Sequence, residues 1–313
     1  MTVIENFEQR HAQLWGSHTV RLKHSLHERP LFSDESLAEI IDHADRRTMT
    51  ISTMEDEVRS SGDWHYCLPG DLSGCEILRA VKSGRIWINF THIAQFDARF
   101  ASVLDELYAD LETLVPGFRP FKRNMGLLIS SPGARVGYHT DIPGQTLLQL
   151  RGSKRLWIYP ASEPFLKVPE FEDVVRRVTE EDITYESWFD DYAEVYDLVP
   201  GDLLHWRLNG PHKVANLDSV NVSITTQHWT GDIRREFALN YGNGLLRNML
   251  HYTPRSRKTS GPAFWVKAGT ALTWRKAGMQ NRQSHRRTVR YHVDPDAPNG
   301  VRLMERQRFG ISG

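Results

Sequence analysis

Between residues 121 and 231 the chain consists of short apolar segments separated by turn signals. Pro-Gly and Gly-Ser pairs divide segments that alternate or run apolar over a few residues. Several short strands with turns at roughly ten-residue spacing are typical of an antiparallel barrel or jelly roll. The strands predicted in this way are Asn124–Ser130, Val136–Asp141, Thr146–Arg151, Lys154–Tyr159, Leu203–Arg207, His212–Ala215 and Val220–Trp229.

Two of these strands are separated only by Gly152 and Ser153. A two-residue connection that contains Gly predicts a β-hairpin. In such a hairpin, Arg151 and Lys154 would pair with each other and lie on the same face of the sheet.

Helical periodicity flanks the strand region on both sides. The clearest helix is an apolar stripe from Phe96 to Leu114 with three- and four-residue steps. We therefore predict an α+β fold in three parts. They are a mixed, mostly helical N-terminal region (1–120), a β core (121–231) and a basic helical C-terminal region (232–313).

His139, Asp141 and His212 are the candidate metal ligands. Residues two apart on a strand point to the same face, so His139 and Asp141 can reach one side of a barrel together. His212 follows a Pro-Gly-Asp turn and a strand, and can join them from across the barrel. Two imidazoles and one carboxylate form the facial triad that binds non-haem Fe(II) and leaves positions open. The pattern predicts an iron-dependent oxygenase.

The sequence around these ligands resembles a known family. The matching segments are GYHTDIPGQTLLQLRGSKRLWIYP and VPGDLLHWRLNGPHKVANLDSVNVSITTQHW. They resemble the JmjC/cupin-like branch of the Fe(II)/2-oxoglutarate-dependent oxygenases, in particular the asparaginyl hydroxylase that acts on hypoxia-inducible factor and its bacterial relatives. The resemblance implies a double-stranded β-helix (cupin) core with flanking helices. It also implies a dioxygenase that couples hydroxylation of a substrate to decarboxylation of 2-oxoglutarate, giving succinate and CO2.

The resemblance implies which cation binds 2-oxoglutarate. In the family, a Lys thirteen residues after the triad Asp binds the distal carboxylate, and Lys154 stands at that position. A dicarboxylate that chelates the metal at one end needs a buried cation at its other end. Arg151 is the competing cation, and is also a candidate for the substrate pocket.

Other positions near the metal are also implied by the resemblance. Gln145 and Gln227 stand where the family often has Asn in contact with the metal and cosubstrate. Val136 replaces a hydroxyl residue that helps to bind 2-oxoglutarate, so another hydroxyl must replace it. The candidates are Tyr138, Thr146 and Ser223.

The substrate remains open between a small molecule and a peptide or protein side chain. Trp206 and Trp229 flank the proposed site, and we expect them either in the barrel core or in the wall of a substrate pocket. Asp141 favours hydroxylation over halogenation, because related iron halogenases have a small residue in place of this carboxylate.

Charge is unevenly distributed along a chain whose formal net charge is zero. Residues 232–313 contain 16 Lys and Arg against five Asp and Glu, so the remainder carries the opposite excess. This predicts a C-terminal region that packs on its own acidic core or forms a homodimer. Nucleic-acid binding is an alternative, made less favourable by the apolar residues Phe264, Trp265 and Leu272 among the basic ones.

A metal-binding cupin that acts as a sensor or isomerase is the second alternative to an oxygenase. Such a protein would give Lys154 no role. No stretch approaches the roughly 18 apolar residues of a membrane helix, and the N-terminus does not have the pattern of a signal peptide. We therefore expect a cytoplasmic protein without a membrane partner.

Overall fold

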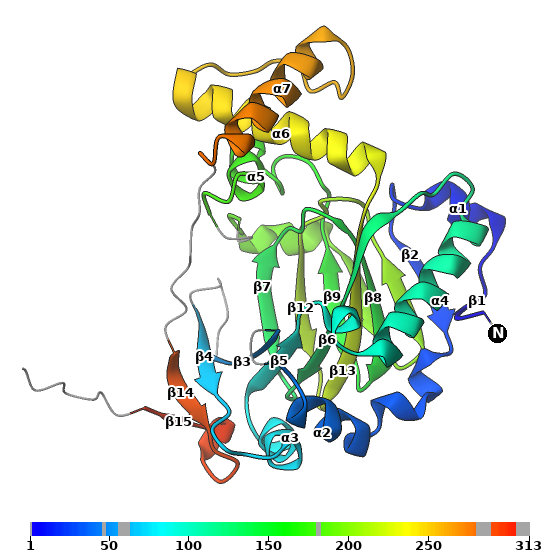
Figure 1. The fold of residues 1–313 in the computed structure, drawn as a ribbon, viewed down its shortest axis with the longest axis vertical. Helices are drawn as coiled ribbons and strands as arrows, with labels where there is room; N and C mark the ends of the chain where they lie inside the picture. The colour runs from blue at the N-terminus through cyan, green and yellow to red at the C-terminus, as the bar shows by residue number, and fades with distance from the viewer. Residues whose placement is uncertain (1, 46–47, 56–62, 180–182, 280–288, 305–313) are drawn as a thin grey trace, which may run out of the picture.

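The fold is built around two β-sheets (Figure 1), and residues of both line a cavity. The computed structural model describes residues 2–45, 48–55, 63–179, 183–279 and 289–304. The large sheet contains, in spatial order, β1 (Ile4–Glu5), β2 (Val20–His24), β11 (Asp202–His205), β8 (Gly144–Arg151), β13 (Asn221–Trp229), β6 (Phe121–Ser130), β5 (Ile86–Phe90), β3 (Met49–Met54), β4 (Trp64–Leu68), β14 (Val289–Val293) and β15 (Val301–Leu303). The small sheet contains β10 (Glu194–Leu198), β9 (Lys154–Ile158), β12 (His212–Asn216) and β7 (Arg135–His139).

Helices cover one face of the large sheet, and the cavity lies on its other face. Along β6, Met125, Leu127 and Ile129 pack into the main hydrophobic core, while Asn124 and Leu128 line the cavity. This alternation is the period of two that a β-strand imposes on its side chains. The α-helices among the described residues are α1 (Gln9–Leu14), α2 (Asp34–Asp42), α3 (Gly74–Ser83), α4 (Ala98–Leu114), α5 (Val168–Val175), α6 (Gly231–Leu250) and α7 (Pro262–Lys276).

The predicted apolar stripe forms α4, which packs against the outer face of the large sheet (Figure 1). Phe100, Leu107 and Leu111 are buried there, whereas Phe96 lies before the helix and is exposed. No helix within the described ranges is long and apolar enough to cross a membrane.

The predicted hairpin at Gly152-Ser153 is wrong. β8 belongs to the large sheet, while β9 pairs with β10 and β12 in the small sheet. The chain therefore turns a corner from one sheet to the other. Gly152 has a φ of +67°, and a Cβ there would lie 2.2 Å from the carbonyl oxygen of Val220. Only Gly fits this corner, because both the left-handed backbone and the close approach exclude a side chain.

The flanking regions contain more strands than the sequence predicted. Residues 1–120 contribute β1 to β5, and residues 232–313 contribute β14 and β15 as well as the helices α6 and α7. The C-terminal region predicted as helical therefore contains strands as well, and β14 pairs in parallel with β4 at the edge of the large sheet. An unpaired edge strand favours such an addition. One core cluster contains residues of all three regions, from Val3 through Leu127 to Val293.

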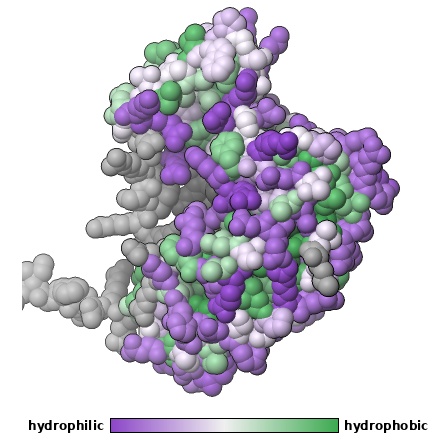
Figure 2. Space-filling view, turned by 45° about the vertical axis from the view of Figure 1, so that its right-hand side comes forward, coloured by the Kyte–Doolittle hydropathy of each residue, from purple (hydrophilic) through white to green (hydrophobic). Residues whose placement is uncertain are grey.

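The helices α6 and α7 lie together beyond the sheets (Figure 1). Figure 2 shows a mainly hydrophilic face on which hydrophobic residues form separate small groups, some of them over these two helices. Exposed apolar side chains there include Leu250, Trp265 and Val266. The predicted homodimer through this region stays a prediction.

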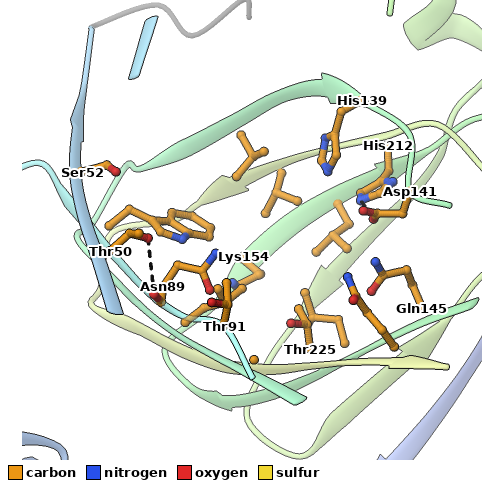
Figure 3. A pocket seen from close by; sticks show the side chains of 18 of the residues that line it. Thr50, Ser52, Asn89, Thr91, His139, Asp141, Gln145, Lys154, His212 and Thr225 are labelled. Atoms are coloured by element: carbon orange, nitrogen blue, oxygen red, sulfur yellow. Dashed lines mark hydrogen bonds and ion pairs between the residues drawn. The ribbon is translucent and has the colours of Figure 1, made fainter. Parts of the chain in front are cut away.

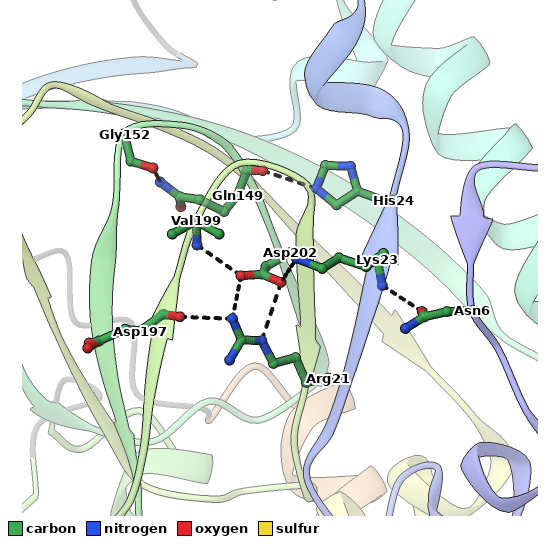
Figure 4. Close-up of polar contacts among 9 residues, drawn as sticks. All are labelled: Asn6, Arg21, Lys23, His24, Gln149, Gly152, Asp197, Val199 and Asp202. Carbon is green, nitrogen blue, oxygen red and sulfur yellow. Dashed lines mark hydrogen bonds and ion pairs between the residues drawn. The ribbon is translucent and has the colours of Figure 1, made fainter.

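A buried carboxylate joins the N-terminal strand β2 to the core strand β11 (Figure 4). Asp202 has no exposed side-chain surface and accepts hydrogen bonds from Arg21 (2.6 Å), Lys23 (2.7 Å) and the N–H of Val199 (2.9 Å). Burial opposes ionisation of Asp202, but these hydrogen bonds outweigh it and lower its pKa below the usual range. The ionised carboxylate therefore stabilises the edge of the large sheet.

We expect Asp202→Asn to lower the free energy of unfolding at pH 7 by about 2 kcal/mol, since it removes charge-assisted hydrogen bonds. A carboxyl group with a lowered pKa in the folded state stabilises the fold above its unfolded pKa of about 3.9 and loses this effect as pH falls. The difference between wild type and variant should therefore shrink below pH 4. Urea unfolding at several pH values measures it.

The control is Asp197→Asn, which removes an exposed carboxylate that pairs with Arg155 at 2.6 Å. Exposed ion pairs contribute about 0–1 kcal/mol. Equal costs for the two variants would contradict a special role for Asp202.

Candidate active site

A cavity of about 410 Å³ lies between the two sheets (Figure 3). Strands of the core and strands of the N-terminal region both line it. The described residues of its wall are Thr50, Ser52, Trp64, Tyr66, Trp87, Asn89, Thr91, His92, Asn124, Gly126, Leu128, Val136, His139, Asp141, Gln145, Leu147, Lys154, Leu156, Trp206, His212, Val214, Thr225 and Gln227.

The three predicted ligands meet at one end of this cavity (Figure 3). His139 ends β7 and His212 begins β12, and the two residues are direct partners in the antiparallel pairing of these strands. One ligand atom from each of His139, Asp141 and His212 can be chosen so that all three lie within 4.8 Å of one another. His212 Nε2 lies 3.4 Å from Asp141 Oδ2. Sequence reasoning therefore identified a group of residues that the fold brings together.

Backbone carbonyl groups fix the orientation of both imidazoles. Nδ1 of His139 donates to the carbonyl oxygen of Gly137 (2.8 Å), and Nδ1 of His212 donates to that of Gly210 (3.1 Å). Because a carbonyl oxygen only accepts, each ring carries its proton on Nδ1 and has its Nε2 lone pair free. This is the arrangement found around metal-binding histidines.

Burial disfavours the charged forms of His212 and Asp141. It lowers the pKa of His212, and the neighbouring His139 adds to the effect. Burial also raises the pKa of Asp141, although His139 and a hydrogen bond from Gln145 act in the opposite direction. Imidazole nitrogens and a carboxylate suit a divalent cation, and a set of two nitrogen ligands and one oxygen ligand fits Fe(II).

Lys154 is fully buried beside the same cavity and has no hydrogen-bond partner for its Nζ among the described residues. Its ammonium group lies 5.5 Å from the centre of the Trp87 ring. Burial lowers the pKa of Lys154 to about 7. A buried amine without a partner is costly to the fold, and an anionic ligand in the cavity would provide the missing partner.

Arg151 takes no part in the cavity wall. It forms an ion pair with Asp34 at 2.6 Å and donates to the carbonyl oxygen of Phe32. The corner at Gly152 separates it from Lys154, because the two residues belong to different sheets. Of the two cations that the sequence left open, only Lys154 lines the cavity.

Three further predicted residues line the cavity. Gln145 and Gln227 face each other across the pairing of β8 with β13, and Gln145 also hydrogen-bonds Asp141. The Trp206 ring lies 4.9 Å from the His212 ring, centre to centre. All three can therefore contact a molecule bound near the ligand cluster.

Trp229 does not reach the cavity. The pairing of β13 with β6 shifts by one register position between Gln227 and Trp229. The Trp229 ring instead packs on Phe237 of α6, with 5.4 Å between ring centres. This β-bulge breaks the alternation that would otherwise have kept Trp229 on the same face as Gln227.

Tyr138 is also turned away from the cavity. Neighbouring residues of a strand point to opposite faces, so a cavity-facing His139 directs Tyr138 outward. Tyr138 is buried in an aromatic cluster and donates to the carbonyl oxygen of Phe165 at 2.8 Å. Its assignment to cosubstrate binding is therefore wrong. Thr146 and Ser223 are absent from the described wall as well.

No sequence motif marks the N-terminal part of the wall. Its hydroxyl, amide and aromatic groups come from β3, β4, β5 and the residues that follow β5. The strand at Ile86–Phe90 was predictable from its alternation, but its pairing with β6 depends on contacts distant in sequence. The side chains of this wall are Thr50, Ser52, Trp64, Tyr66, Trp87, Asn89, Thr91 and His92.

The fold is similar to that of a solved oxygenase. YcfD, a ribosomal oxygenase from Escherichia coli solved in complex with cobalt and 2-oxoglutarate, has 14% sequence identity and a TM-score of 0.51, with 95% of this chain and 76% of YcfD covered. The chain has the fold of YcfD. An X-ray structure of E. coli YcfD gives 13% identity and a TM-score of 0.50, covering 91% of this chain and 71% of that chain.

The likeness to YcfD confirms the predicted α+β architecture and the JmjC/cupin fold that the resemblance implied. No protein-family model and no curated protein matches the sequence.

We expect Lys154→Met to stabilise the metal-free, cosubstrate-free protein by roughly 2–4 kcal/mol at pH 7, since it removes a buried amine with a lowered pKa. The unfolded chain binds more protons at this group between pH 7 and about 10, so wild-type stability rises with pH in that range. The advantage of the variant should therefore shrink toward pH 10. Urea unfolding at both ends of the range measures it.

Arg151→Met is the matched control. It removes a half-exposed ion pair and should lower stability by about 0–1 kcal/mol, the opposite direction. Destabilisation of a similar size in both variants would mean that Lys154 has a structural partner.

Proposed function

We propose that this protein is an Fe(II)- and 2-oxoglutarate-dependent dioxygenase that hydroxylates its substrate. The proposal rests on one observation, that a set of metal ligands and a buried amine line the same cavity. His139, Asp141 and His212 offer a two-nitrogen, one-oxygen ligand set, and Lys154 offers a buried amine without a hydrogen-bond partner among the described residues. A metal ion and a dicarboxylate together would satisfy both.

Each residue has a defined part in this function. His139, Asp141 and His212 would hold the iron on one face and leave the remaining positions open. Lys154 would pair with the distal carboxylate of 2-oxoglutarate. When bound, Fe(II) and 2-oxoglutarate supply oxygen activation coupled to release of succinate and CO2.

Neighbouring side chains support these groups. Gln145 holds the carboxylate of Asp141 through its hydrogen bond. Leu147, Leu156 and Val214 make part of the wall apolar and exclude water. The carboxylate of Asp141 occupies a position that a halogenase would leave free for a halide, and this supports hydroxylation.

We expect alanine at His139, Asp141 or His212 to weaken Fe(II) binding by more than about 100-fold, because each variant removes a ligand and not merely an outer partner. Anaerobic calorimetric titration of Fe(II) into the metal-free protein measures the effect. His92→Gln is the control, since His92 lines the same cavity outside the cluster. The ligand assignment fails if His92→Gln weakens binding as strongly as the three alanine variants.

Lys154→Met should bind Fe(II) as wild type does but bind 2-oxoglutarate about 10- to 100-fold more weakly, since it lacks a charge-assisted hydrogen bond. The visible charge-transfer band of the anaerobic Fe(II)–2-oxoglutarate complex reports the binding. Arg151→Met should retain wild-type affinity. An iron-loaded wild type without the band would instead support a metal-binding cupin that lacks oxygenase chemistry.

A further inference from the structure

In the part of the cavity wall that the structure describes, formal charge is confined to the groups already assigned. Among the described residues that line it, Asp141 is the one carboxylate and Lys154 the one amine, and there is no guanidinium group. The imidazoles are those of the ligand cluster and of His92, which donates from Nδ1 to Asn124 Oδ1 at 2.8 Å. The rest of the described wall is uncharged.

The assigned charges balance one another once the site is loaded, and this step rests on the proposed function. A ferrous ion and the Lys154 ammonium bring three positive charges. The Asp141 carboxylate and 2-oxoglutarate bring three negative charges. The loaded centre is therefore neutral overall, and it has no excess charge to offset a charged substrate.

A charged substrate group would enter this cavity without a described counterion. Moving an unpaired ion from water into a site of this kind costs several kcal/mol even after relaxation. An uncharged polar group does not have this penalty if it finds hydrogen-bond partners. The described residues of the wall thus disfavour both cationic and anionic substrates.

The uncharged part of the wall offers many hydrogen-bond partners. In Figure 3, Thr50, Asn89 and Thr91 lie on the opposite side of Lys154 from the ligand cluster. The carboxamides and hydroxyls lining the cavity are those of Asn89, Asn124, Gln145, Gln227, Thr50, Ser52, Tyr66, Thr91 and Thr225. Carboxamides both donate and accept hydrogen bonds, and so do hydroxyls.

Aromatic rings complete this wall. Trp64 and Trp87 come from β4 and β5, and their ring centres lie 5.5 Å apart.

The described wall is uncharged outside the assigned groups, and its carboxamides and hydroxyls both donate and accept hydrogen bonds. We infer that the group of the substrate that enters this cavity is uncharged and polar, as in a carboxamide or hydroxyl compound. It is not a cationic or anionic side chain.

Three probes of the same length and different charge test this inference. They are the N-acetyl methylamides of glutamine, glutamate and ornithine, each added to the anaerobic Fe(II)–2-oxoglutarate complex. The glutamine probe should shift the charge-transfer band and, in air, accelerate succinate formation. It should bind at least about tenfold more tightly than either charged probe.

The possible outcomes separate the inference from the proposed function. Absence of the band before any probe is added would contradict the proposed function itself. A band that responds best to the glutamate or ornithine probe would overturn the inference alone. A band that none of the three probes changes would overturn it as well.

Asn124→Asp gives the test a second arm. The variant keeps an acceptor for His92 and adds a carboxylate to the wall. It should shift selectivity toward the ornithine probe by at least about tenfold. Asn6→Asp is the matched control, because Asn6 accepts from the N–H of Lys23 outside the cavity and its change should leave selectivity as in wild type. Unchanged selectivity in Asn124→Asp would contradict the inference.

Discussion

The candidate active site depends on one backbone register, the pairing of β7 with β12 that sets His212 opposite His139. Side chains of a strand alternate between its two faces, so a slip of one residue would turn one imidazole out of the cavity. β12 also pairs with β9 in a continuous register that directs Lys154 into the same space. The geometry of the ligand cluster and the position of the buried amine are thus consequences of the same small sheet.

This arrangement requires the fold to bury groups that are unfavourable without a ligand. Burial raises the pKa of Asp141 and lowers the pKa of Lys154, so it favours the neutral form of both side chains. The large sheet and the helices on its outer face supply the apolar contacts that hold these groups in place, and the core cluster extends over all three regions of the chain. A bound cation at the ligand cluster and a bound dianion at Lys154 would remove this cost.

Local sequence patterns were sufficient to predict the core strands and the ligand cluster. They were insufficient to predict how the strands are connected and paired. His139 and Asp141 are two apart on a strand, so their common direction follows from β geometry alone. The same rule, applied to Tyr138, would have placed it on the outer face. Gly152-Ser153 looks like a hairpin turn because a tight corner between sheets needs the same Gly as a tight turn within one. The bulge before Trp229 and the parallel addition of β14 depend on partners distant in sequence.

The part of the cavity wall that comes from the core could be predicted from the sequence, and the part that comes from the N-terminal region could not. The half that carries the ligand cluster and Lys154 has a recognisable spacing, because metal and dicarboxylate chemistry requires particular residues at particular positions. The half built from β3, β4 and β5 has no motif, since hydroxyls, amides and aromatic rings can meet a substrate in many arrangements. Specificity resides in such contacts and in the penalty that an unmatched charge incurs. The proposed reaction can therefore be argued from a few residues of the core, while the proposed preference for an uncharged substrate depends on side chains of both the core and the N-terminal region.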